Sequence, residues 1–313
     1  MERGAISDDR LRLIFTCCHP ALATEARVAL TLRTLGGLST PEIARAFLLP
    51  EATLAQRLVR AKRKIRDAGI PYRVPPGDLL PERLESVLAV LYLVFNEGYS
   101  ATAGDALVRR ELCAEAIRLT RVLVELMPGE PEVLGLLALM LLQDSRREAR
   151  VSAEDELVLL EDQDRSRWDA GEIAEGIEVA ERATRHGTPG PYTIQASIAE
   201  AHASARRPED TRWDRIAELY ERLAEMAPSP VVELNRAVAV AMAEGPERGL
   251  ELIGPLSEPL ERYQWFHSAR ADLLRRLDRN DEAAEAYERA LSLTANAVER
   301  RFLRRRLAEV RPG

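Results

Sequence analysis

The residues best suited to chemistry lie in one basic segment, where five of seven residues carry a positive charge: Arg60-Ala-Lys-Arg-Lys-Ile-Arg66. Side chains of this kind bind phosphates through charge-assisted hydrogen bonds. Residues 1–80 hold 13 Lys/Arg against 8 Asp/Glu, a net charge of +5, whereas residues 81–313 hold 31 against 43, a net charge of −12. We therefore expect the N-terminal part to meet nucleic acid and the acidic remainder to meet protein.

Two other groups of residues suggest metal-binding or catalytic chemistry. Cys17-Cys18-His19 is one, but adjacent cysteines on a helix do not readily chelate one ion, and no second Cys/His cluster completes a site. The acidic residues Glu161, Asp162 and Asp164 are the other, and they lack a glycine-rich turn, a calcium-loop spacing or a partner histidine. We expect buried thiols and a solvated or salt-bridged loop, with no catalytic residue, metal or cofactor.

The basic segment ends a predicted helix over residues 50–67, whose apolar residues recur at the spacing of one helix face: Leu54, Leu58, Ala61 and Ile65. A shorter helix precedes it, opened by the capping box Ser39-Thr-Pro-Glu42, and Leu48-Leu49 forms the turn between them. The face opposite the apolar stripe presents small or polar residues first and cations later: Ala52, Gln56, Val59, Arg60 and Arg63. A helix that enters the major groove and leaves it past phosphates needs this order. The pattern predicts a helix-turn-helix.

Few aromatic residues, 5%, and many alanines and leucines predict an all-α protein. We expect a DNA-binding domain over residues 1–70, a stiff linker over 71–81 that contains four prolines, and a helical repeat domain over 82–313. A 34-residue period pairs Ala237 with Ala271, Gly249 with Ala283, Ile253 with Tyr287 and Leu256 with Ala290. It predicts a solenoid of tetratricopeptide-like helical hairpins with a capping helix over 296–310. Residues 143–169 interrupt it as a long insertion.

Two segments resemble region 4 of the extracytoplasmic-function sigma factors, the module that reads the −35 promoter element: Leu35-Gly-Gly-Leu-Ser-Thr-Pro-Glu-Ile-Ala-Arg-Ala-Phe47 and Thr53-Leu-Ala-Gln-Arg-Leu-Val-Arg-Ala-Lys-Arg-Lys64. Other segments resemble one group of these factors, which carries a tetratricopeptide C-terminal extension: Phe15-Thr-Cys-Cys-His-Pro20, Asn96-Glu-Gly-Tyr99, Leu160-Glu-Asp-Gln-Asp-Arg-Ser-Arg-Trp168 and Leu234-Asn-Arg-Ala-Val238. No segment resembles region 2, which binds the polymerase clamp and melts the −10 element, so we do not expect this chain to initiate transcription alone.

The resemblance implies partners and contact residues. The partners are promoter DNA and the RNA polymerase core, the latter through its β-flap. The positions that match the family's −35 contacts are Ala55, Gln56, Val59 and Arg60. Ala52 lies beside them on the outward face. The resemblance assigns the phosphate contacts to Arg57, Arg63 and Lys64. In the insertion we expect a surface for a regulatory protein, with Trp168 as its anchor, formed by Glu161, Asp162, Asp164, Arg165, Arg167 and Trp168.

Two functions remain open on the sequence. The chain is either promoter-reading machinery that its repeat domain controls, or a tetratricopeptide scaffold for a partner protein with a vestigial helix-turn-helix. The longest apolar run, residues 133–142, is about half of what a bilayer requires, and no secretory signal opens the chain, so we expect a cytoplasmic protein.

Overall fold

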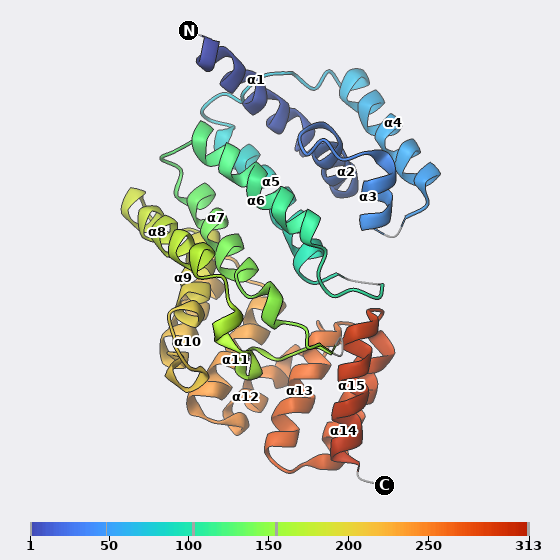
Figure 1. The fold of residues 1–313 in the computed structure, drawn as a ribbon, viewed down its shortest axis with the longest axis vertical. Coiled ribbons are helices and arrows are strands. Elements are labelled where there is room, and N and C mark those ends of the chain that lie inside the picture. The colour runs from blue at the N-terminus through green and yellow to red at the C-terminus, as the bar shows by residue number, and fades with distance from the viewer. Residues whose placement is uncertain (1, 48, 102–103, 154–155, 312–313) are drawn as a thin grey trace.

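The computed structural model describes residues 2–47, 49–101, 104–153 and 156–311, and the ordered elements in these ranges are helices and two isolated bridges (Figure 1). The all-α prediction is confirmed. Four helices form the N-terminal part: α1 Glu2–Cys17, α2 Thr24–Thr34, α3 Thr40–Ala46 and α4 Glu51–Asp67. The predicted turn at Leu48-Leu49 lies partly outside the described residues, because Leu48 is not among them.

Local sequence signals place these helices. The backbone N–H of Ser39 donates to Glu42 Oε2 at 2.6 Å and the backbone N–H of Glu42 donates to Ser39 Oγ at 3.4 Å, so both halves of the predicted capping box form. Gly69 ends α4 with a φ of +59°, a conformation that glycine adopts without strain. Helix α1 extends over Glu2–Cys17. No proline or glycine lies between 5 and 17 to stop it.

The remaining helices follow one another as antiparallel neighbours: α5 Leu80–Tyr99, α6 Arg110–Leu126, α7 Pro131–Asp144, α8 Ala170–His186, α9 Pro191–Ala203, α10 Trp213–Met226, α11 Pro230–Glu244, α12 Pro246–Ile253, α13 Gln264–Arg276, α14 Asn280–Leu293 and α15 Ala297–Val310. The 34-residue period corresponds to the two helix pairs α11–α12 and α13–α14. A Cβ at Gly249 would lie 2.5 Å from Ala241 Cβ, so the small residue permits close packing of α11 and α12. Among the described residues no helix has the length and hydropathy to cross a bilayer.

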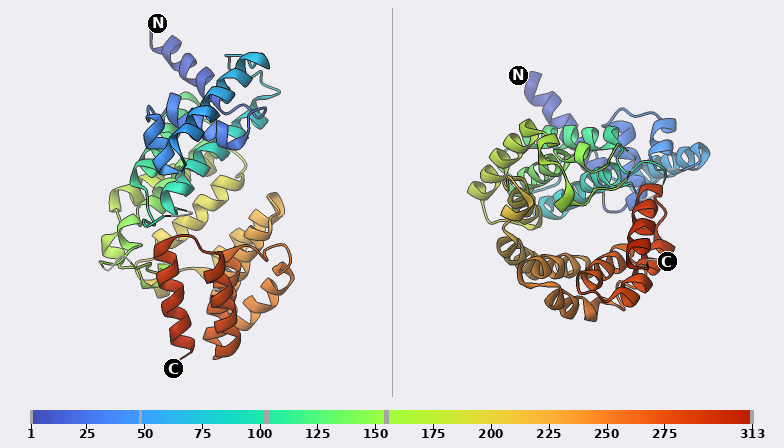
Figure 2. Two further views of the ribbon diagram at one scale, coloured as in Figure 1. Left: turned by 90° about the vertical axis from the view of Figure 1, so that its right-hand side faces the viewer. Right: turned by 60° about the horizontal axis from the view of Figure 1, so that its bottom comes forward.

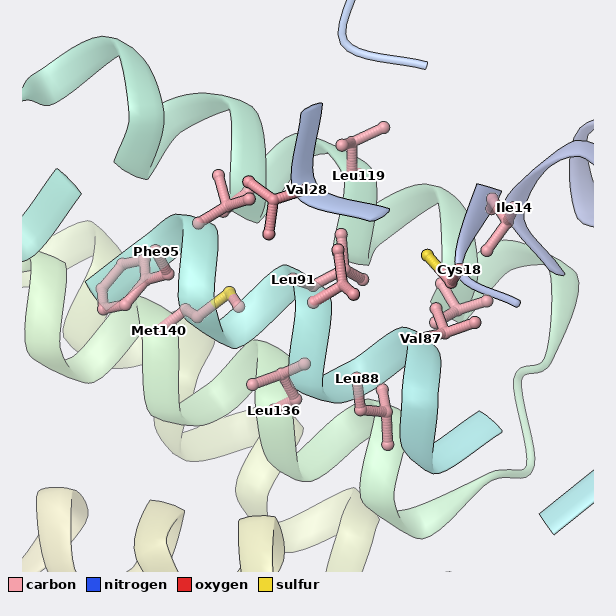
Figure 3. Packing of buried hydrophobic residues seen from close by; sticks show 14 of the residues in the cluster. Ile14, Cys18, Val28, Val87, Leu88, Leu91, Phe95, Leu119, Leu136 and Met140 are labelled. Atoms are coloured by element: carbon pink, nitrogen blue, oxygen red, sulfur yellow. The ribbon is translucent and has the colours of Figure 1, made fainter. Parts of the chain in front are cut away.

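One hydrophobic core joins the N-terminal helices to the helical hairpins. Figure 3 shows Ile14 of α1 and Val28 of α2 together with Leu91 of α5 and Leu119 of α6 in the same buried cluster, which continues as far as α9. Hydrogen bonds accompany this packing: Ser86 Oγ donates to the Cys18 carbonyl at 2.7 Å and Arg83 Nη2 donates to the Phe15 carbonyl at 2.8 Å. Residues 68–79 connect α4 to α5 without separating their cores, and the end of the predicted linker 71–81 belongs to α5. The four N-terminal helices are therefore docked on the hairpins.

The predicted insertion, described over residues 143–153 and 156–169, connects distant parts of the chain. It leaves α7 at Asp144 and returns at Asp169, whose backbone N–H donates to the Ser145 carbonyl at 2.8 Å. On the way Leu157 and Leu159 pack against the hydrophobic cluster of α13, α14 and α15, and Glu161 pairs with Arg276 of α13 at 2.8 Å. The insertion therefore links the first hairpins to the last ones.

A second link closes the helices into a ring, which the right-hand view of Figure 2 shows as α15 returning to the side of the N-terminal half. Asn296, fully buried, caps α15 by accepting from the backbone N–H of Val298, and its amide donates to the carbonyls of Ala101 and Ala106 at 3.1 and 3.0 Å. The predicted capping helix therefore also joins the two ends of the helical array. We call the contacts of Asn296 with Ala101 and Ala106 the clasp.

We expect Asn296→Ala to lower the free energy of unfolding by about 2–4 kcal/mol. It removes a helix cap and leaves the buried Ala101 carbonyl and the part-buried Ala106 carbonyl without the amide donor. Asn280→Ala, at an exposed asparagine that begins α14, is the matched control. Urea unfolding followed by circular dichroism measures both. Equal, small losses in the two variants would show that the clasp contributes little.

Candidate nucleic-acid interface

Helix α4 is held by its apolar face and exposes the opposite one. Leu54, Leu58 and Ala61 are buried against α2 and α3, and Ile65 is half-buried, as the helical spacing predicted. Burying three such side chains contributes several kcal/mol, which fixes the rotation of α4 about its axis. Packing inside the N-terminal part therefore determines which face of α4 stays exposed to solvent.

All eight residues predicted to contact DNA lie on α4, and seven of them are exposed: Ala52, Ala55, Gln56, Val59, Arg60, Arg63 and Lys64. Val59 has 66% of its surface exposed, unusual for a large apolar side chain in a region that packs well elsewhere. Arg60 forms no ion pair with any described residue. Arg63 pairs with Asp67 across one turn at 3.1 Å, but both side chains are well exposed, so the pair is weak and water-screened.

Arg57 differs from the other seven. It is half-buried and points toward the repeat helices, where it lines a groove of about 460 Å³ together with Phe47 of the turn and Leu93 of α5. Trp265 of α13 lines the same groove, although it lies more than 200 residues away in the chain. Leu93 and Trp265 are 44% and 39% exposed, so the groove is open and apolar. Sequence spacing gave no sign of it, because no periodic pattern marks Trp265.

The predicted partner surface in the insertion is only partly on the surface. Trp168 is buried, with 7% of its surface exposed, and the Arg165 guanidinium lies 4.6 Å from its ring centroid. Arg165 Nη1 donates to the carbonyls of His202 and Ala205 at 2.7 and 2.6 Å. Glu161 already forms an ion pair with Arg276. The expectation that Trp168 anchors a partner is corrected: its ring packs inside the fold. Asp162, Asp164 and Arg167 remain exposed.

The three cysteines lie inside the core. Cys17, Cys18 and Cys113 are each at most 3% exposed, and Cys18 Sγ lies 3.4 Å from Thr31 Oγ1. Burial raises the pKa of Cys17 to about 12 and that of Cys18 to about 11, and it raises the pKa of Cys113 as well. A nucleophile or metal ligand needs the thiolate, so the environment disfavours both roles.

Comparisons with known proteins assign the basic N-terminal part and part of the acidic remainder of the chain to two different families. Residues 12–65 match the family described as sigma-70, region 4, which covers α4 and the helices that hold it. Residues 83–184 match a family of unknown function, DUF6596. An uncharacterized protein of Rhizobium meliloti (strain 1021) is 50% identical over 300 residues, which are 96% of this chain and 71% of that protein. The region 4 match contains every residue predicted to contact DNA.

We expect all three thiols to be unreactive toward Ellman's reagent at pH 8 in the native protein and fully reactive in urea. A pKa near 11 for Cys18 lowers its thiolate fraction about 100-fold from that of a free cysteine, and burial blocks the reagent as well. Because these pKa values are raised on folding, the stability they contribute is present below pH 9 and is lost as the pH rises further. One fast-reacting thiol in the native state would restore the nucleophile interpretation.

Proposed function

We propose that this chain, which belongs to the same family as the Rhizobium meliloti protein and carries a sigma-70 region 4 domain, reads the −35 element of promoters through the outward face of α4. One observation carries the proposal. Within the region 4 match, the second helix of the helix-turn-helix keeps its polar and basic face exposed although the rest of the domain is packed against α5 and α6.

The outward face offers the groups that base recognition requires. Ala52 and Ala55 let the N-terminal turns of α4 approach the groove closely. The Gln56 amide pairs with adenine and the Arg60 guanidinium with guanine, each through two hydrogen bonds, which is how such side chains read base edges. Further along, Arg63 and Lys64 meet phosphates, with Arg57 at the edge of the face.

In finer detail, we assign the chain to the extracytoplasmic-function group with a tetratricopeptide extension. The four segments quoted above and the 34-residue period support this assignment. RNA polymerase core is then the second partner, through its β-flap. The open groove beside Arg57, with Leu93 and Trp265 exposed in it, is available to such a partner.

The repeat domain acts in this proposal as a platform and not as an inhibitor. An inhibitor would cover the recognition face, whereas Gln56, Arg60 and Arg63 are exposed in the docked arrangement. A regulatory protein would use the exposed part of the insertion, which consists of Asp162, Asp164 and Arg167.

The second candidate is a scaffold with a vestigial helix-turn-helix, which the helical hairpins would serve equally well. Salt dependence separates the two. Phosphate contacts release counterions, so the affinity of a promoter reader for a duplex falls steeply as salt rises, whereas a scaffold shows no such binding.

We expect Arg60→Ala to weaken binding of the whole chain to a −35 duplex by about 1–3 kcal/mol, because it removes a two-bond base contact. Gln56→Ala should relax base preference at one position. Lys64→Ala should weaken all sequences about equally and reduce the salt slope by about one. Fluorescence anisotropy over a salt series measures all three.

Arg304→Ala, at an exposed arginine of α15, is the control and should leave affinity unchanged. If Arg60→Ala retains full affinity while remaining folded, α4 does not present this face to DNA. If Arg60→Ala unfolds the protein, Arg60 is structural and our orientation of the helix is wrong.

The platform role predicts that Arg167→Glu combined with Asp162→Lys impairs promoter activity and leaves duplex affinity intact. Both side chains are exposed and no side-chain hydrogen bond from a described residue holds either, so reversing their charges disturbs a partner and not the fold. Reporter transcription and anisotropy are measured in parallel. Unchanged transcription would remove the insertion from the proposal, and tighter duplex binding would favour inhibition instead.

A further inference from the structure

A cavity of about 490 Å³ lies where the ring closes, apart from the outward face of α4. Its walls come from the end of α5, from the insertion, and from α11, α13, α14 and α15. Two segments far apart in the sequence, 96–99 and 234–238, meet here, because Tyr99 and Asn235 both line the cavity. A volume of this size suits a small organic molecule.

One wall carries a cation that has no carboxylate partner. The Arg150 guanidinium carbon lies over the Tyr99 ring, 3.7 Å from its centroid, and Nη1 donates to the Tyr99 carbonyl. In the described part of the chain this is its one protein hydrogen bond, and it forms no ion pair. Arg147, three residues earlier, pairs with both Asp144 and Glu172 at 2.6 and 2.8 Å. Burial lowers the pKa of Arg150, yet a guanidinium keeps its charge in a protein.

The two acidic side chains that line the cavity, Glu299 and Asp272, form no ion pair with Arg150, although the Glu299 carboxylate lies near enough to offset part of the lowering that burial causes in the pKa of Arg150. Glu299 is buried and accepts a hydrogen bond from Gln264 Nε2 at 2.6 Å, and burial raises its pKa. Asp272 is held by Arg275 and Arg276 at 2.6 and 2.7 Å. A partly buried cation that no carboxylate contacts directly is costly, and an anion that binds beside it in the cavity reduces that cost.

Most of the remaining lining is apolar or aromatic, and the polar side chains among it are those of Ser100, Asn235, Gln264 and Ser268. Trp265 and Phe302 face the cavity from α13 and α15, and Leu234 and Val238 face it from α11. A guanidinium binds a carboxylate through two parallel hydrogen bonds, and aromatic walls bind a flat apolar body. The two features together define a ligand with one carboxylate and one apolar group.

We propose that this cavity is a binding site for a small organic carboxylate, with the carboxylate on Arg150 and the apolar body against Trp265 and Phe302. The site is independent of the DNA-binding role, so either proposal can fail alone. The volume of about 490 Å³ favours a free small molecule over a protein tail.

The test is isothermal titration calorimetry of the whole chain with 2-naphthoate and with its neutral counterpart 2-naphthamide. The proposal expects 2-naphthoate to bind at one site and 2-naphthamide to bind at least about tenfold more weakly, because only the former has a charge for Arg150. Arg150→Gln should remove this preference by weakening 2-naphthoate alone.

Arg165→Gln is the matched control, because it removes another arginine that lies on an aromatic ring but does not line the cavity. It should leave both affinities unchanged. Ser268→Trp, which fills the cavity from α13 and leaves Arg150 in place, should abolish binding of both probes even if Arg150→Gln fails to fold. Thermal unfolding of each variant verifies that it is folded.

Equal affinity for the two probes, no heat of binding up to about 10 mM 2-naphthoate, or full binding by Ser268→Trp would each overturn the proposal. A tetrapeptide with a free C-terminus that binds more tightly than 2-naphthoate, while its amidated form does not bind, would overturn it too, since the occupant would then be a protein tail.

Discussion

Burial of one continuous hydrophobic surface, from α1 through α9, controls how this protein presents its DNA-binding helix. Val28 and Leu32 of α2 lie in the same cluster as Leu91 of α5 and Leu119 of α6. Each buried aliphatic side chain of this size contributes about 1.5–3 kcal/mol relative to exposure, so separating the two parts would cost far more than one contact supplies. The charge difference between residues 1–80 and 81–313 suggests cutting the chain there, but both halves would then expose core. DNA binding is accordingly a property to measure on the whole chain.

A second constraint acts at the other end of the molecule. The clasp at Asn296 and the insertion tie the last hairpins to the first, through contacts between residues about 100 to 200 positions apart, such as Glu161 with Arg276 and Asn296 with Ala101. A solenoid whose repeats touch only their neighbours has no such contacts. Closure is what places Trp265 of α13 beside the N-terminal helices and gathers the walls of the cavity around Arg150.

Local features of the sequence predicted local features of the structure. The capping box at Ser39 and Glu42, the buried stripe of α4 and the 34-residue hairpin period all follow from interactions within one or two helices, which a sequence encodes by spacing. The burial of Trp168 and Arg165 in the insertion could not be predicted, because it depends on residues far away in the sequence. Trp168 and Arg165 resemble surface residues in a charged loop, but the carbonyls of His202 and Ala205 that hold Arg165 are known only from the fold. The groove at Arg57 and the cavity at Arg150 were missed for the same reason.

The chain offers an unusually direct test of the central claim, because its only two lysines, Lys62 and Lys64, are both exposed on α4. Acetylation of the native protein, followed by peptide mass spectrometry with and without a −35 duplex, reports on this helix through its two lysines, while the α-amino group is acetylated in a separate peptide. Our account predicts that the duplex slows modification of Lys64 more than that of Lys62, and that high salt abolishes the protection. Unchanged acetylation of Lys64 in a sample whose duplex is demonstrably bound would contradict it.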